Sequence, residues 1–298
     1  MVSISVVVAT YRRDALLTKA LESLSAQSFR DFEIIVVDDN TESAWNEKVA
    51  EAARQFRDRH PELPLRLLMN SGTHGSAGAR NEGIRAAEGS YITFLDDDDL
   101  YLPEKLEHQY KAMLESDADY SLTDLILYDE EDRPVDRRLR PFVKDDDSPE
   151  KLTELHMLHH LTGTDAIMMR KDYLFKIGLF GCVDIGDEFY LMQNAISAGG
   201  KFCYLHRCDV KAYVHPPADG LSAGKQKIQG ENHLYRFKKT YFPRFSASVR
   251  RRIKMRHYAV LSYTYLRMRK PGKAFRSAFL SAGASPLGLL RLLMERKV

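Results

Sequence analysis

The chain has 298 residues, 44% of them hydrophobic and 10% aromatic, which suits one large or two modest globular domains and excludes an intrinsically disordered protein. The net charge of +2 conceals a division: the first 224 residues hold 25 basic and 40 acidic side chains (−15), and the other 74 hold 19 basic and two acidic ones (+17). No run of about 18 apolar residues occurs, so a transmembrane helix is not expected.

Strands and helices alternate over the first 115 residues. Four β-branched or apolar runs predict buried strands, at residues 2–9, 32–37, 65–69 and 91–95. Helices are predicted between and after them, at residues 14–24, 47–57, 77–87 and 103–115. Asp14 is expected to cap the first helix. This alternation is typical of βαβ units around a parallel sheet.

The pattern changes after residue 119. A Ser-Pro pair predicts that a helix begins near residue 149, and short elements follow as far as residue 215. Helices then return in the basic tail, at residues 232–241, 246–269 and 272–279.

Polar residues follow each predicted strand of the first half. Ligands of open parallel sheets bind at the carboxyl ends of the strands. Those ends carry Thr10 and its neighbours, Asp38 and Asp39, a glycine-bearing loop at 70–76, and the four aspartates 96–99. We therefore expect acids and glycines to converge on one edge of the sheet.

Four consecutive aspartates are costly to bring together unless a cation is present. Carboxylate oxygens are the usual ligands of Mg²⁺ and Mn²⁺, which complete their shells with substrate phosphates. Asp38 or Asp39 could accept a hydrogen bond from a ribose or a base, and Arg80 could reach a diphosphate. The chain has neither the G-x-G-x-x-G fingerprint after its first strand nor a P-loop, which argues against a dinucleotide site and a P-loop NTPase.

Four segments, at residues 5–13, 35–40, 78–83 and 89–99, resemble family 2 glycosyltransferases of the GT-A fold. The resemblance covers roughly residues 1–215 and is strongest over 1–110. It implies an α/β fold: a Rossmann-like, mostly parallel central sheet flanked by helices, with a basic helical C-terminal extension. The implied domains are a catalytic domain at 1–222, with a nucleotide-sugar half (1–110) and an acceptor half (111–222), and a helical region at 223–298.

The resemblance also implies an inverting transferase that uses Mn²⁺ or Mg²⁺ and a UDP- or dTDP-sugar. Asp39 would hold the uracil or thymine ring, Arg80 would lie by the phosphates, and Asp98 would bind the metal. His215 would approach the metal or the diphosphate. The implied nucleotide-binding residues are Thr10, Tyr11, Arg13, Asp38, Asp39, Arg80, Asp96 and Asp97.

An inverting transfer needs a base, which the family places at the start of a later helix. The candidates here are Asp187, which we prefer, and Glu188. The acceptor would be a glycan, a lipid-linked sugar or another hydroxyl compound, in cell-surface polysaccharide synthesis.

The basic tail at 223–298 interleaves arginines with aromatic and leucine residues, a composition that fits an anionic membrane surface. Docking against the acidic catalytic domain and a homodimer interface are the alternatives, and no motif indicates nucleic-acid binding. A strand-like start and only three cysteines predict a cytoplasmic protein, peripheral at the inner face of the plasma membrane if the tail binds there.

Three other functions are weighed against the transferase. A haloacid-dehalogenase-like phosphotransferase would place its aspartate pair after the first strand, where this chain has Thr10. A receiver-like module is about half this length. A degenerate transferase that only binds nucleotide is disfavoured by the presence of Asp39, Asp98 and Asp187.

Overall fold

The computed structural model describes residues 2–181, 183, 186–214 and 224–295. The chain divides into two compact units. Unit 1 comprises Met1–Pro149, Leu161–Val183 and Asp187–Val214, and unit 2 comprises Glu150–His160, Asp184–Gly186 and His215–Val298. Unit 2 thus includes a segment that lies between two parts of unit 1 in the sequence.

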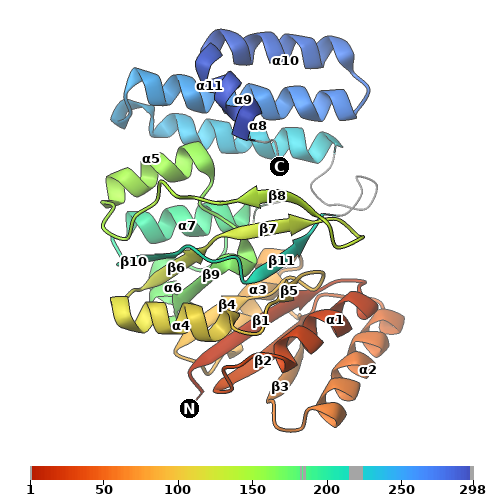
Figure 1. Cartoon of the computed structure of the whole chain (residues 1–298). Helices are drawn as coiled ribbons and strands as arrows, with labels where there is room; N and C mark the ends of the chain where they lie inside the picture. The colour runs from red at the N-terminus through yellow and green to blue at the C-terminus, as the bar shows by residue number, and fades with distance from the viewer. Residues whose placement is uncertain (1, 182, 184–185, 215–223, 296–298) are drawn as a thin grey trace. The chain divides into compact units, whose positions relative to one another are not determined.

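A seven-stranded sheet forms the centre of unit 1, in the order β10-β6-β9-β4-β1-β2-β3 (Figure 1). All neighbouring strands are parallel except that β9 runs antiparallel to both β4 and β6. The strands are β1 (Ile4–Thr10), β2 (Phe32–Asp38), β3 (Leu65–Met69), β4 (Tyr91–Phe94), β6 (Tyr120–Thr123), β9 (Ile167–Arg170) and β10 (Phe202–Leu205).

A second, four-stranded sheet in unit 1 has the order β5-β11-β7-β8. Its strands are β5 (Leu100–Tyr101), β7 (Leu125–Tyr128), β8 (Pro134–Arg138) and β11 (Val210–Tyr213). Because β5 follows β4 after only a few residues, this sheet begins beside the four aspartates.

Alternating side chains of β1 pack against helices on both faces of the large sheet. Val6 and Val8 share a core with Leu17 and Leu21 of α1, whereas Val7 faces Gly83 of α3. Buried side chains of α2 and α4 belong to the same core as Val6 and Val8. The helices of unit 1 are α1 (Asp14–Ser25), α2 (Ser43–Arg59), α3 (Ser76–Ala86), α4 (Lys105–Ser116), α6 (Lys171–Ile177) and α7 (Asp187–Ser197), with the 3-10 turn η1 (Thr164–Ala166).

The strands predicted in the first half are all present, and the prediction of a mostly parallel sheet is confirmed. The predicted cap is wrong: α1 begins at Asp14 itself, and its N-cap residue, Arg13, makes no side-chain capping bond. An arginine side chain has no acceptor with which to cap a helix, and that of Arg13 pairs with Asp97 and Asp98.

Unit 2 is helical. Its elements are α5 (Pro149–His159), α8 (Gly224–Thr240), η2 (Phe242–Arg244), α9 (Ala247–Arg267), α10 (Pro271–Ala284) and α11 (Pro286–Glu295). Helix α9 packs against α8 and α10, and Ser246 caps it by accepting a hydrogen bond from the Val249 amide. Among the described residues, no helix combines the length and apolarity that crossing a membrane requires.

Candidate active site

The loop after β1 is held by one aspartate from the end of β4. Asp97 accepts hydrogen bonds from Thr10 Oγ1 (2.7 Å), Arg13 Nη1 (3.1 Å) and, more weakly, the Tyr11 amide (3.3 Å). Burial raises the pKa of Asp97 to about 6, against the stabilising effects of Thr10 and Arg13. Tyr11 itself is half exposed, so this loop offers an aromatic ring at the sheet edge. The structure thus brings together four of the predicted nucleotide-binding residues.

Asp38 and Asp39, at the end of β2, have different surroundings. Asp38 is fully buried and accepts hydrogen bonds from Asn40 and Asn46. Asp39 accepts from Asn70 Nδ2 (2.6 Å) and the Gly75 amide (2.8 Å), and its carboxylate lies 2.9 Å from a ring nitrogen of His74. Asp39 therefore anchors the glycine-bearing loop, while Asp38 shapes the turn that follows β2.

Arg80 links the strand-end aspartates to α7. From α3, its guanidinium donates to Asp96 Oδ1 (2.6 Å) and to Asp187 Oδ2 (3.0 Å). Burial opposes the charge on Arg80, but the two carboxylates outweigh it and raise its pKa. The predicted phosphate-binding arginine and the preferred base are thereby held in direct contact.

Three carboxylates converge at the end of β4: oxygens of Asp96, Asp99 and Asp165 all lie within 4.8 Å of one another. Burial and repulsion from Asp96 raise the pKa of Asp165 to about 7. The pKa of Asp99 is also raised, by burial and then by the charge of Asp165. Asp96 is the most exposed of the three and pairs with Arg80.

This cluster fits a hard divalent cation. Carboxylate oxygens are what Mg²⁺ and Mn²⁺ prefer, and a cation there would offset the repulsion among three close acids. Asp98, the predicted ligand, is outside the cluster and forms an ion pair with Arg13. His215, the other predicted ligand, lies outside the described residues.

A buried lysine is linked through Tyr101 to the backbone of Asp165, a member of the three-carboxylate cluster. Lys105 of α4 is 1% exposed and donates to Thr93 Oγ1 (2.6 Å) and Tyr101 Oη (2.8 Å). Tyr101 Oη in turn lies 3.3 Å from the backbone oxygen of Asp165. Burial lowers the pKa of Lys105 far below its usual value, against the attraction of Asp165. This network thus reaches the backbone of Asp165, one member of the cluster.

The two candidate bases lie together at the start of α7. Asp187 is buried and accepts from Arg80, and Ser76 Oγ lies 3.5 Å from the same carboxylate oxygen. Burial, together with the hydrogen bond to Asp187 and its charge, raises the pKa of Glu188 to about 8. The surroundings of Glu188 therefore favour its protonated form.

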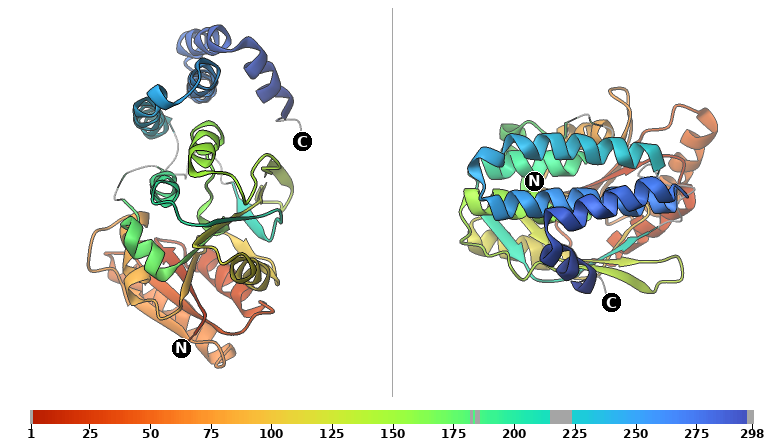
Figure 2. Two further views of the ribbon diagram at one scale, coloured as in Figure 1. Left: turned by 90° about the vertical axis from the view of Figure 1, so that its left-hand side faces the viewer. Right: turned by 90° about the horizontal axis from the view of Figure 1, so that it is seen from above.

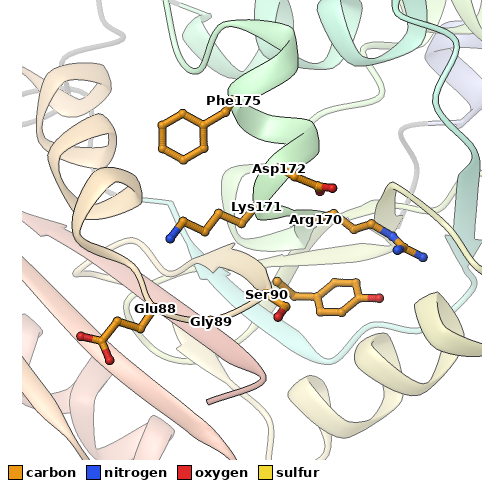
Figure 3. Close-up of a pocket in the computed structure, with 8 residues that line it drawn as sticks. Glu88, Gly89, Ser90, Arg170, Lys171, Asp172 and Phe175 are labelled. Carbon is orange, nitrogen blue, oxygen red and sulfur yellow. The ribbon is translucent and has the colours of Figure 1, made fainter. Parts of the chain in front are cut away.

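A separate hollow of about 400 Å³ is lined by residues that include Ser90, Arg170 and Phe175, which Figure 3 draws as sticks. It lies where β4 begins, at the opposite end of that strand from the aspartates. Since ligands of such sheets bind at the carboxyl ends of strands, we place the candidate active site at the acidic edge.

Sequence reasoning missed Asp165 and Lys105. The available signal for Asp165 was weak, an acid just before the apolar run 166–169. Because β9 pairs antiparallel with β4, the start of β9 lies next to the end of β4. Lys105 lies between Glu104 and Glu107 in a predicted helix, a charged context that gives no sign of burial.

The family profile described as "Glycosyl transferase family 2" matches residues 5–175, more than half of the chain. The chain therefore belongs to glycosyltransferase family 2, as the sequence motifs predicted.

Among its relatives, "Uncharacterized glycosyltransferase YwdF" of Bacillus subtilis is 32% identical over 145 residues, 48% of this chain and 51% of the relative. The Escherichia coli protein "UDP-Glc:alpha-D-GlcNAc-diphosphoundecaprenol beta-1,3-glucosyltransferase WfgD" is 31% identical over 117 residues, 39% of this chain and 43% of the relative. The chain thus spans about half, or less, of the length of the curated relatives it matches.

Solved structures confirm the predicted fold. Staphylococcus aureus TarS 1-349, in complex with UDP-GlcNAc, superposes with a TM-score of 0.61 at 16% identity, covering 93% of this chain and 90% of that one. Pyrobaculum calidifontis mannosyltransferase PcManGT, in complex with GDP-Man and Mn²⁺, gives 0.58 at 19% identity, covering 97% and 78%. At these identities the likeness concerns the fold alone.

Proposed function

We propose that this chain transfers a sugar from a UDP- or dTDP-sugar to an acceptor hydroxyl, with inversion at the anomeric carbon. The observation that carries the proposal is the arrangement at the carboxyl ends of β1, β2 and β4. There, three carboxylates suited to a divalent cation are joined through Arg80 to a candidate base, Asp187, in a family 2 chain.

Donor recognition is assigned to the loops after β1 and β2. A carboxylate has about four acceptor positions, and three protein donor groups lie within hydrogen-bond distance of Asp39. We assign a further position to the N3–H that uracil and thymine share. The Tyr11 ring is exposed next to this loop and is assigned to the nucleoside.

The metal is assigned to Asp96, Asp99 and Asp165, with Asp98 and His215 as the family-derived candidates for further ligands. A bound Mn²⁺ or Mg²⁺ would neutralise the diphosphate leaving group. Arg80 would add a positive charge beside the phosphates, and the Lys105 network would help to hold the backbone of Asp165 in place.

The transfer itself uses Asp187. The acceptor oxygen bonds to the anomeric carbon as the bond from that carbon to the diphosphate oxygen breaks, and Asp187 takes the hydroxyl proton. Burial and the proximity of Asp187 favour the protonated form of Glu188, and Asp187 is the acid that contacts Arg80, so we assign the base to Asp187. Lipid-linked sugars are a fitting acceptor class, since the name of the relative WfgD includes such an acceptor.

Calorimetric titration tests the proposal. The full chain is titrated with UDP, dTDP and GDP, with Mn²⁺ and with EDTA. We expect UDP or dTDP to bind in the presence of Mn²⁺ and at least about tenfold more weakly in EDTA. Asp165→Asn should abolish this metal effect.

The matched control is Asp132→Asn, which removes a carboxylate paired with Lys211 at the surface of the same unit. This variant should bind nucleotide as the wild type does. If wild type binds none of the three nucleotides, the transferase proposal is wrong. If Asp132→Asn and Asp165→Asn lose binding equally, the metal assignment is wrong.

A further inference from the structure

The two C-terminal helices of unit 2 expose large apolar side chains. Phe275 and Phe279 lie one turn apart on α10 and are 76% and 71% exposed. On α11, Leu287, Leu290 and Met294 are 75%, 57% and 65% exposed. We call these five side chains the apolar face.

Helix α10 packs against α9 with small residues and not with its phenylalanines. Its buried residues are Ala274, Ser277 and Ser281, and Ser281 Oγ donates to the Met255 carbonyl oxygen of α9 at 2.8 Å. Figure 2 shows α10 running alongside α9. A helix at a protein–water boundary normally buries its large apolar side chains. Because α10 does the reverse, its phenylalanines are available to a surface outside unit 2.

The chain around the apolar face is strongly basic, and Glu295, the last residue of α11, is the one acid between residues 232 and 295. No acidic residue occurs from 232 to 294, whereas 15 lysines and arginines do. Lys273, Arg276 and Arg291 lie on α10 and α11 themselves, and all three are exposed. Helices with an apolar face and basic neighbours are complementary to anionic lipid, because the cations meet the headgroups while the apolar side chains enter the acyl boundary.

We propose that the apolar face docks on an anionic membrane surface, with α10 and α11 lying in the interface. This inference rests on unit 2 and not on the transfer reaction. Docking would concentrate the protein at the surface where lipid-linked hydroxyl acceptors are found.

Vesicle flotation of the full chain tests the proposal. The wild type is mixed with vesicles of phosphatidylcholine alone or with about one third phosphatidylglycerol, in low and high salt. We expect at least about tenfold more binding to the anionic vesicles, and less binding as salt rises. The paired change Phe275→Ser and Phe279→Ser should lower binding at least about tenfold.

The matched control is Leu114→Gln on α4, which removes a leucine that is 51% exposed in unit 1. It should bind vesicles as the wild type does. Nucleotide calorimetry and circular dichroism check that each variant is folded. Since the altered phenylalanines contribute little buried area, the paired variant should pass both checks.

Tryptophan fluorescence tests the same proposal with a variant that is expected to keep binding to vesicles. Trp45 is the single tryptophan, so Phe275→Trp in a Trp45→Phe background reports on one position. We expect its emission to shift to shorter wavelength with anionic vesicles. The proposal is wrong if wild type does not float with anionic vesicles, if the emission does not shift, or if the chain is a dimer that the paired variant converts to a monomer, because a second copy then covers the apolar face.

Discussion

Glu188 and Asp187 are adjacent acids with different surroundings. Asp187 accepts a hydrogen bond from Arg80, whereas burial and the proximity of Asp187 raise the pKa of Glu188 to about 8. The neutral form of Glu188 is therefore the one that the fold favours. A raised pKa contributes stability below the unfolded value of about 4.5, and this stability is lost as pH rises from there through about 8.

Glu188→Gln keeps a neutral hydrogen-bond donor at this position. We expect it to unfold at a higher temperature than wild type, by an amount that grows between pH 5 and pH 8 and corresponds to about 3–4 kcal/mol over that range. Thermal unfolding of both proteins at several pH values measures this difference. A constant difference across that range would contradict the protonated state of Glu188. The variant should retain transfer activity, whereas Asp187→Asn should lose it.

At the scale of elements, α3 makes two close backbone contacts. A Cβ on Gly83 would lie 2.4 Å from Val7 Cγ1, so glycine allows the helix to approach β1. A Cβ on Gly78 would lie 1.8 Å from the Thr73 carbonyl oxygen. Gly78 therefore lets the loop at 70–75 fold back over α3, where the loop is also held by Asp39.

Gly78→Ala should displace this loop. We expect the free energy of unfolding to fall by about 1–3 kcal/mol, and nucleotide to bind more weakly because Asp39 loses its partners. Chemical denaturation and calorimetry measure the two effects. Gly283→Ala is the control: it lies in α10 with open space around it, so stability should rise by up to about 1 kcal/mol with no change in nucleotide binding.

At the scale of the whole molecule, the described residues proposed for nucleotide and metal lie in unit 1, and the apolar face lies in unit 2. This division matches the charge division of the sequence. It also means that donor binding and membrane docking use different residues.

Hydrogen exchange should show that nucleotide protects amides of unit 1 and not those of unit 2. UDP with Mn²⁺ is expected to slow amide exchange in the loops at 70–76 and 96–99 and in η1, since bound ligand suppresses local opening there. The exchange rates in α9 and α10 should not change. EDTA should remove the protection of the loops and of η1. Protection of α9 or α10 by the nucleotide would show that unit 2 takes part in the donor site.

Motifs and apolar runs were enough to predict the family, the strands of the first half and the edge of the sheet that carries the acids. They were enough because buried parallel strands leave continuous apolar runs, and because polar residues after such strands share one edge. The composition also predicted the basic helical tail.

Which acids lie close together depends on the pairing of strands that are distant in the sequence. Asp165 comes from a strand that runs against its neighbours, and only the β4–β9 pairing places it beside Asp96 and Asp99. Likewise, the packing of α10 through serines and alanine, which leaves Phe275 and Phe279 outside, depends on the approach of α9. Such long-range pairings leave no local periodicity in the chain, so residue spacing alone could not reveal them.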